Sequence, residues 1–358
     1  MNRKLLQVTL AMLVVLISLL TACAPAATPP PTAKPTSPPA PTDTPVPPTS
    51  IHTPMPPTPM PEPELQHTWE SYPDVKYVND MAFDHDGNLW VGTTRGAVKL
   101  DPTDGTYTRY TTDDGLARNE VLSVAVAQDG AAWLGTKRGG VCRFDGKTWT
   151  TYTEADGLMD DYVRSMAMAP DGALWFGTFE DDGGVSRFDG ATWRTYTEAD
   201  GLAAKYVLDI TSSPDGAMWF GILDSGVSRF DGKAWTTYTR DNGLANNWTK
   251  AVAIAPDGTV WVGTLDYGVS RFDGQSWITY TEDDGLVNNE VYSIAVAPTG
   301  AVWFATDTGV SRFDGESWAT YTTDDGLVHN KVRSIIVAPD GAVWFGTMLG
   351  VSRYGPPD

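Results

Sequence analysis

Short runs of apolar residues alternate with turn-forming residues along most of the chain. The pattern is clearest in NEVYSIAVAPTGAVWFATDTGVSRFDGESWATYTTDDGL, residues 289–327. Runs of this kind, bounded by Gly, Asp and Pro, are typical of strands, and no helical periodicity competes with them. We therefore predict four strands in this unit, over residues 291–297, 301–306, 310–313 and 318–322.

The same unit is repeated through the chain. The glycine of its first turn occurs seven times at intervals of 41 to 44 residues, as Gly87, Gly130, Gly172, Gly216, Gly258, Gly300 and Gly341. Four antiparallel strands repeated at this interval are typical of a β-propeller, because one such sheet cannot bury both faces alone, whereas neighbours packed radially can. We therefore predict an all-β fold, a seven-bladed β-propeller over residues 64–358.

Residues 67–73, HTWESYP, look like the last strand of a unit whose first three strands are missing. They contain Trp69 and Tyr72, a Trp-x-x-Tyr pair that recurs in the fourth strands as Trp149/Tyr152, Trp193/Tyr196, Trp235/Tyr238, Trp277/Tyr280 and Trp318/Tyr321. The final unit stops at VSRY, residues 351–354, after its third strand. We predict that residues 67–73 complete the seventh blade and close the ring, so that no sheet edge is exposed at the seam.

The first residues resemble an export signal. A basic start, Asn2-Arg3-Lys4, precedes a 16-residue apolar run from Leu5 to Leu20, which is short for a membrane span of ~20 residues. The run ends in LTAC, residues 20–23, which resembles the bacterial lipobox. That resemblance implies a lipoprotein signal peptide over residues 1–22 and lipidation of Cys23, which would anchor the chain to a membrane. The alternative is an ordinary signal peptide or an uncleaved anchor.

Residues 23–63 are rich in Pro and Thr and almost free of charged and aromatic residues. Such a composition cannot bury enough apolar surface to fold, so we predict a disordered, extended linker. At ~3.1 Å per residue it could hold a domain up to about 120 Å from the anchor. Docking of proline-recognition domains and O-glycosylation of its threonines are further options.

Two of the repeated units, GLVNNEVYSIAVAPTGAVWFATDTGVSRFDG and GLVHNKVRSIIVAPDGAVWFGTMLGVSRYG, resemble the two-component regulator propeller repeat, which occurs in the extracellular sensor regions of bacterial hybrid histidine kinases. The resemblance covers essentially all of residues 65–358. It implies a propeller that senses a ligand outside the cytoplasm. No kinase or receiver pattern follows Asp358, so we expect signalling, if any, to need a separate partner.

The net charge of −20 makes nucleic acid an unexpected partner, because an acidic surface repels phosphate. Only two cysteines occur, so no disulfide framework is expected. Cys142 replaces the Ser of the repeated VSRF, which predicts a small buried filler and not a nucleophile.

Residues that recur in every blade are explained by packing and turn geometry. We assign this role to Trp133, Trp175, Trp219, Trp261, Trp303 and Trp344, and we expect the arginines of SRF to pair with carboxylates or carbonyls: Arg187, Arg229, Arg271 and Arg312. The Asp pairs of the DDGL segments predict turns with a buried Leu. The alternative, one calcium site per blade, needs more oxygen ligands than these pairs supply.

Function is expected where the blades differ, in the loops that join the second strand to the third and the fourth strand to the next blade. We predict a ligand-binding face formed by Tyr162, Arg164, Asp182, Tyr206, Asp224, Trp248, Lys250, Asp266, Tyr267, Tyr292, Asp307 and Arg333. Rings beside carboxylates suit an oligosaccharide, and they also suit a cationic ligand. The alternative is that these aromatic residues pack between blades and expose only their tips.

The preferred hypothesis is an extracytoplasmic, lipid-anchored, non-enzymatic ligand-binding or sensor-type module without cofactor or metal. Its partner would be an oligosaccharide, a small molecule or a protein. One alternative is a propeller enzyme, because the PDGxxWF turns also resemble streptogramin lyase-like propellers, whose activity relies on a His and Glu cluster with a divalent metal. Only His329 lies on a candidate loop, which makes such a cluster hard to assemble. The other alternative is a scaffold for envelope proteins.

Overall fold

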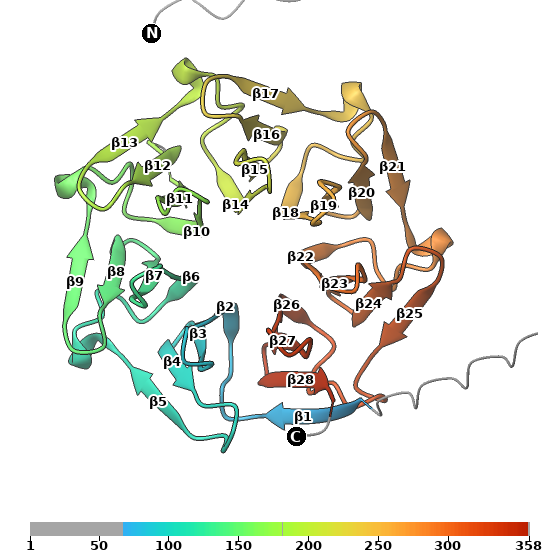
Figure 1. Cartoon of the computed structure of the whole chain (residues 1–358), viewed down its shortest axis with the longest axis horizontal. Helices are drawn as coiled ribbons and strands as arrows, with labels where there is room; N and C mark the ends of the chain where they lie inside the picture. The colour runs from blue at the N-terminus through green and yellow to red at the C-terminus, as the bar shows by residue number, and fades with distance from the viewer. Residues whose placement is uncertain (1–66, 181, 357–358) are drawn as a thin grey trace, which may run out of the picture. The chain divides into compact units, whose positions relative to one another are not determined.

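The computed structural model describes residues 67–180 and 182–356. The predicted signal peptide, the lipidation site Cys23 and the predicted linker lie outside the described residues. The described part forms seven four-stranded antiparallel sheets, arranged radially in a ring (Figure 1). The innermost strands of all seven sheets line a cavity at the centre of the ring, in what we call the central channel. The prediction of an all-β, seven-bladed propeller is therefore confirmed.

The strands of each blade follow one another from the channel to the rim. The innermost strands are β2 (Val78–Phe83), β6 (Val121–Val126), β10 (Val163–Met168), β14 (Val207–Ser212), β18 (Thr249–Ile254), β22 (Val291–Val296) and β26 (Val332–Val337). The second strands are β3 (Leu89–Thr93), β7 (Ala132–Thr136), β11 (Leu174–Thr178), β15 (Met218–Ile222), β19 (Val260–Thr264), β23 (Val302–Thr306) and β27 (Val343–Thr347).

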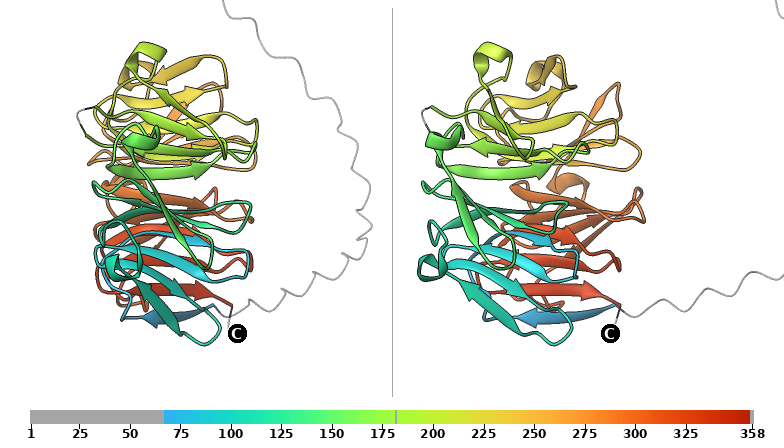
Figure 2. Two further views of the ribbon diagram at one scale, coloured as in Figure 1. Left: turned by 90° about the vertical axis from the view of Figure 1, so that its left-hand side faces the viewer. Right: turned by 60° about the vertical axis from the view of Figure 1, so that its left-hand side comes forward.

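The two outer layers complete each blade. The third strands are β4 (Gly96–Leu100), β8 (Val141–Phe144), β12 (Val185–Phe188), β16 (Gly226–Phe230), β20 (Val269–Phe272), β24 (Val310–Phe313) and β28 (Val351–Gly355). The outermost strands are β1 (Thr68–Tyr72), β5 (Tyr107–Tyr110), β9 (Trp149–Tyr152), β13 (Trp193–Tyr196), β17 (Trp235–Tyr238), β21 (Trp277–Tyr280) and β25 (Trp318–Tyr321). Figure 2 shows the ring from the side, with the connecting loops on its two opposite faces.

Every residue of the second strands is buried, because both faces of these strands are covered by neighbouring blades. The repeated tryptophans fill the spaces between blades, as predicted. Trp175 stacks on Tyr196 of its own blade with ring centres 5.3 Å apart, and it meets Phe230 of the next blade at 5.9 Å. Glycine in the second strand allows this close packing: a Cβ on Gly135 would lie 2.8 Å from the Val163 side chain of the next blade.

Strand β1 closes the ring by pairing with β28, about 280 residues away in the sequence. The register places Trp69 opposite Tyr354 and Glu70 opposite Arg353, and the Arg353 guanidinium binds the Glu70 carboxylate at 3.0 Å. Figure 1 shows the two strands side by side, one in blue and one in red. The predicted role of residues 67–73 is confirmed.

The turns after the outermost strands are short 3-10 helices, η1 (Thr112–Asp114), η2 (Glu154–Asp156), η3 (Glu198–Asp200), η4 (Arg240–Asn242) and η5 (Glu282–Asp284). In η1 the Asp114 carboxylate accepts hydrogen bonds from the Thr111 amide at 2.8 Å and the Thr111 hydroxyl at 3.1 Å, which is a capping box. Leu116 behind it is buried. The second Asp of the segment thus stabilises a turn, as the sequence predicts.

Cys142 occupies a buried position on β8. Its sulfur accepts a hydrogen bond from the Ala117 amide at 3.2 Å, where Ser186 of the next blade accepts one from the Met159 amide at 2.8 Å. Burial raises the pKa of the Cys142 thiol, which keeps it in the unreactive neutral form. The prediction of a buried filler is confirmed.

Candidate functional site

Each innermost strand carries a β-bulge near its start. In blade one Val78 pairs with Thr93 and Asp80 with Gly92, so Asn79 has no opposite residue. A bulge redirects the side chain of the extra residue, and here the seven extra residues line one cavity in the central channel: Asn79, Leu122, Arg164, Leu208, Lys250, Tyr292 and Arg333. The bulge is common to all blades, whereas the side chain that it presents changes.

In six of the seven blades the residue after the bulge also lines this cavity, and in two of them it is an aspartate. Asp80 accepts hydrogen bonds from the amides of Met81 and of Val124 in the next blade, both at 2.9 Å. In blade four, the Asp209 carboxylate likewise accepts hydrogen bonds from the Ile210 amide at 2.9 Å and from the Val252 amide of blade five at 2.8 Å. These carboxylates therefore join neighbouring blades.

The environment of the two wall aspartates favours their neutral form. Desolvation raises the pKa of Asp80 to about 6, against the lowering effect of its amide partners and of Arg164. Desolvation and the charge of Asp80 raise the pKa of Asp209 to about 7. Near neutral pH the channel wall consequently carries less negative charge than its two aspartates would carry in water.

This raised pKa predicts a pH-dependent stability. The folded state binds the Asp209 proton more tightly than the unfolded chain, so raising the pH from about 5 to 8 should destabilise the fold. Asp80, Arg164 and Lys250 share the cavity and set the size of the effect. We expect the melting temperature to be a few degrees higher at pH 5 than at pH 8, and the difference to shrink in Asp209→Asn. An Asp209→Asn protein with an undiminished difference would contradict this assignment.

Four of the predicted binding residues, Arg164, Lys250, Tyr292 and Arg333, lie together in the channel cavity. Lys250 and Arg333 lie against the Tyr292 ring. The Lys250 amine nitrogen lies 4.2 Å and the Arg333 guanidinium carbon 4.5 Å from the ring centre, and the Lys331 amine lies 5.4 Å away. A tyrosine face surrounded by cations is a stabilising arrangement.

The lysines of this cluster are already paired, whereas two arginines are not. Lys250 binds the Glu290 carboxylate at 2.6 Å, and Lys331 binds Asp307, which also accepts a hydrogen bond from the Tyr292 hydroxyl at 3.1 Å. Within residues 67–180 and 182–356, Arg164 and Arg333 are half-buried and have no hydrogen bond or ion pair. Their donors face a polar cavity.

The remaining predicted residues lie farther out on the loop face. The Trp248 indole donates a hydrogen bond to the Asp224 carboxylate at 2.5 Å, and Trp248 and Tyr267 keep 43% and 50% of their surface exposed. Asp224 and Asp266 adopt left-handed backbone conformations, with φ of 60° and 65°.

Two further tyrosines and one aspartate of the predicted face complete this outer group. Tyr162 and Tyr206 flank Phe179, with ring centres 5.7 and 5.1 Å from it, and Asp182 is an exposed loop residue. The two tyrosines therefore belong to a short aromatic row that joins blades three and four. The predicted face thus divides into a channel group and an outer group.

Sequence reasoning missed Asn79, Leu122 and Leu208 in the channel, and the wall residues Asp80 and Asp209. Their signal was present: the residue after the first one of each innermost strand varies between blades, as Asn, Leu, Arg, Leu, Lys, Tyr and Arg, between neighbours that repeat. The sequence analysis considered aromatic and charged residues in the loops, and it therefore identified only four of the seven bulge residues that line the channel.

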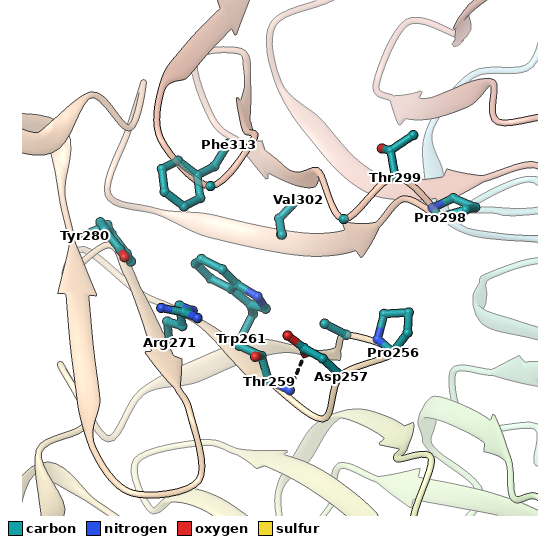
Figure 3. Close-up of a pocket in the computed structure, with 13 residues that line it drawn as sticks. Pro256, Asp257, Thr259, Trp261, Arg271, Tyr280, Pro298, Thr299, Val302 and Phe313 are labelled. Carbon is teal, nitrogen blue, oxygen red and sulfur yellow. Dashed lines mark hydrogen bonds between the residues drawn. The ribbon is translucent and has the colours of Figure 1, made fainter.

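A second hollow, of about 370 Å³, lies on the opposite face between blades five and six (Figure 3). It is lined by Asp257, Trp261, Arg271 and Tyr280, among others. The equivalent arginines of blades two, three and four bind a turn aspartate at 2.6 or 2.7 Å, as Arg143–Asp129, Arg187–Asp171 and Arg229–Asp215.

Blades five and six depart from this pairing. In blade five the Asp257 carboxylate accepts a hydrogen bond from the Thr259 amide at 2.9 Å and does not bind the arginine. Arg271 has no ion pair within the described residues. The expected pairing is confirmed for Arg187 and Arg229 and wrong for Arg271. Arg312 reaches only Asp314, at 3.8 Å, because Thr299 replaces the turn aspartate of its blade.

The described residues contain no group of three or more His, Cys, Asp or Glu arranged to hold a metal ion. His329 accepts a hydrogen bond from the Lys331 amide at 3.0 Å through Nδ1, so that nitrogen is engaged in a local turn. None of the helices in the described part is long and apolar enough to cross a membrane.

The fold and the channel define a class, a seven-bladed propeller whose repeated blades present different residues to the channel. The family model of the two component regulator propeller matches residues 71–95, 157–180 and 326–348. These segments lie in the first, third and seventh blades and their connections, so the resemblance seen in the sequence is confirmed. No curated protein sequence matches the chain.

Solved structures share the fold. The extracellular domain of a putative hybrid two component system from B. thetaiotaomicron has a TM-score of 0.70 and 21% identity, over 79% of this chain and 39% of that one. Streptogramin B lyase has a TM-score of 0.66 and 17% identity, over 81% and 98%. Virginiamycin B lyase from Staphylococcus aureus has a TM-score of 0.64 and 16% identity, over 81% and 99%.

These identities establish a common fold and nothing finer. The chain spans about two fifths of the length of the two component sensor domain, whereas it spans nearly all of the lyases. The streptogramin lyase likeness anticipated from the PDGxxWF turns is therefore real at the level of the fold.

Proposed function

We propose that this protein is a non-enzymatic, extracytoplasmic ligand-binding module of the sensor type, and that its ligand binds at the loop-face end of the central channel. One observation carries the proposal: at seven equivalent bulges the blades present five different kinds of side chain to one polar cavity. A repeated fold needs no such variation for packing, so the variation serves recognition.

The outer group of the loop face would extend this site. Exposed Trp248 and Tyr267 offer flat apolar surfaces beside Asp224 and Asp266. Such surfaces suit a small molecule or an oligosaccharide that covers the mouth of the channel. A separate protein would have to carry any signal onward.

The proposed location outside the cytoplasm rests on the sequence and on likeness. The similar sensor structures are titled extracellular domains of two component systems. The lipobox-like LTAC and the Pro/Thr-rich segment that follows it favour lipidation at Cys23 and a spacer to the membrane.

The enzyme alternative has the lyase fold likeness in its favour. Against it, the one candidate histidine of the loop face uses Nδ1 in a local hydrogen bond, and the nearby carboxylates Glu290 and Asp307 are bound to lysines. To serve as a base or a metal ligand, this histidine nitrogen and these two carboxylates would have to give up their present partners.

A thermal-shift screen of oligosaccharides, amino acids and other small metabolites tests the proposal. A ligand at one hundred times its Kd should stabilise the fold by about 2.7 kcal/mol, and the shift should fall in Trp248→Ala and Asp266→Ala. Tyr107→Ala, an exposed rim residue of β5, is the matched control and should keep the shift. Chemical conversion of a stabilising compound would favour the enzyme instead, and a screen without any stabilising compound would favour a scaffold.

A further inference from the structure

We propose that the channel cavity is an anion site that takes a carboxylate, sulfate or phosphate group of the ligand, with Arg164 and Arg333 as its principal donors. The inference rests on the proposed function, because it names the chemistry of the ligand at the same site. It also departs from the expectation of a neutral sugar or a cationic ligand.

The first argument is the unused donors of Arg164. A guanidinium presents five N–H donors, and half-buried polar groups normally find partners. The arginines on the opposite face of blades two to four each bind a carboxylate. Arg164 binds none of the described residues, although Asp80 and Asp209 line the same cavity. Both aspartates accept backbone amides of the neighbouring blade instead.

The second argument is the position of Arg333. Its guanidinium lies against the Tyr292 face, with 4.5 Å from its central carbon to the ring centre, which fixes the group and leaves its N–H edge available. Lys250 and Lys331 on the same ring are neutralised by Glu290 and Asp307. The uncompensated positive charge of the cluster is therefore that of the arginine.

The third argument is the electrostatic contrast between the channel and the rest of the protein. The chain has a net charge of −20, yet Arg164 and Arg333 line this cavity without an ion pair, and desolvation opposes ionisation of the two carboxylates in its lining, Asp80 and Asp209. A confined positive site in an acidic protein concentrates an anion by focusing its field.

The size of the cavity limits what enters it. Its volume of about 70 Å³ corresponds to roughly five waters at 10–15 Å³ each. This volume is closer to the size of a carboxylate, sulfate or phosphate group than to that of a pyranose ring with its hydroxyls. The anionic group would therefore point into the channel while the remainder of the ligand lies among the outer aromatic residues.

Sulfate and inorganic phosphate are suitable probes for the full chain, compared with chloride at constant ionic strength. We expect either oxyanion to raise the melting temperature of the native protein, and Arg164→Gln or Arg333→Gln to weaken its apparent affinity at least tenfold. Arg271→Gln is the matched control, because Arg271 is also half-buried without an ion pair but lies on the opposite face. It should bind as the native protein does.

The pH dependence gives an independent readout, because sulfate keeps its charge between pH 5 and 8. Protonation of Asp80 and Asp209, whose pKa values burial raises, makes the cavity more positive at the lower pH. Sulfate should therefore bind more tightly at pH 5.5 than at pH 8, and Asp209→Asn should reduce that difference.

Three results would overturn the anion site. Neither oxyanion stabilises the protein beyond chloride; the stabilisation survives in both Arg164→Gln and Arg333→Gln; or it is lost in Arg271→Gln alone, which would transfer it to the hollow between blades five and six. A screened ligand that depends on Trp248 but is indifferent to both channel arginines would leave the binding module intact and refute only its anionic chemistry.

Discussion

A protein that begins at residue 74, and therefore lacks β1, should melt roughly 10 °C or more below one that begins at residue 64. The deletion removes Trp69, whose ring packs against Phe345 and Tyr354 with centres 5.5 and 4.9 Å away. Loss of one large aromatic side chain alone costs about 3–5 kcal/mol, and each kcal/mol moves the melting temperature of a domain of this size by about 2 °C. The strand pairing with β28 is lost in addition.

Calorimetry of the two proteins measures the difference, and size-exclusion chromatography adds a second observation. The shorter protein exposes the edge of β28, which invites pairing between molecules. We expect it to associate with increasing concentration, while the longer one does not. Equal melting temperatures would mean that β1 does not hold the ring closed.

Trp344→Ala should destabilise the fold strongly, because this tryptophan is buried where the ring closes. Trp344 is 1% exposed, stacks on Tyr72 of β1 with ring centres 5.3 Å apart, and contacts Phe83 of blade one edge-on at 5.9 Å. Its truncation leaves a cavity at the junction of three chain segments. We expect a loss of about 3–5 kcal/mol in unfolding free energy, measured by urea titration.

Trp248→Ala is the control for that measurement, because it makes the same change at a residue that is 43% exposed. Its side chain contributes one exposed hydrogen bond, to Asp224, so we expect a loss below about 1 kcal/mol. Similar losses in the two variants would show that Trp344 is not a core residue of the seam.

Most of the fold could be predicted from the sequence because the same pattern of strands and turns occurs seven times. In the unit at residues 289–327, the predicted third strand, residues 310–313, agrees with the observed strand Val310–Phe313. The other three observed strands are each one residue shorter than the predicted ones, at one end only. Closure by residues 67–73 was also predictable, since the Trp-x-x-Tyr pair occurs in six of the seven outermost strands, β1 among them; β5 has Tyr107 in place of the tryptophan.

The site was less predictable, for a geometric reason. The alternation of inward and outward side chains along β10 or β18 does not reveal that Arg164 and Lys250 have no opposite residue on the neighbouring strand. A bulge depends on how two strands pair, and it cannot be seen in the sequence of one strand. The neutralisation of Lys250 by Glu290, 40 residues away, depends on contacts between blades. The same holds for Asp209, whose amide partner Val252 belongs to the next blade.

Because of the bulges, the residues that hold the strands together differ from the residues whose side chains line the channel. An unpaired position tolerates asparagine, leucine, arginine, lysine or tyrosine without a change in the strands around it, as the seven blades already demonstrate. Descendants of such a chain can therefore acquire a new preference by single codon changes at seven places, with little loss of foldability. A protein engineer can vary the same seven positions in combination to obtain channels of a chosen charge.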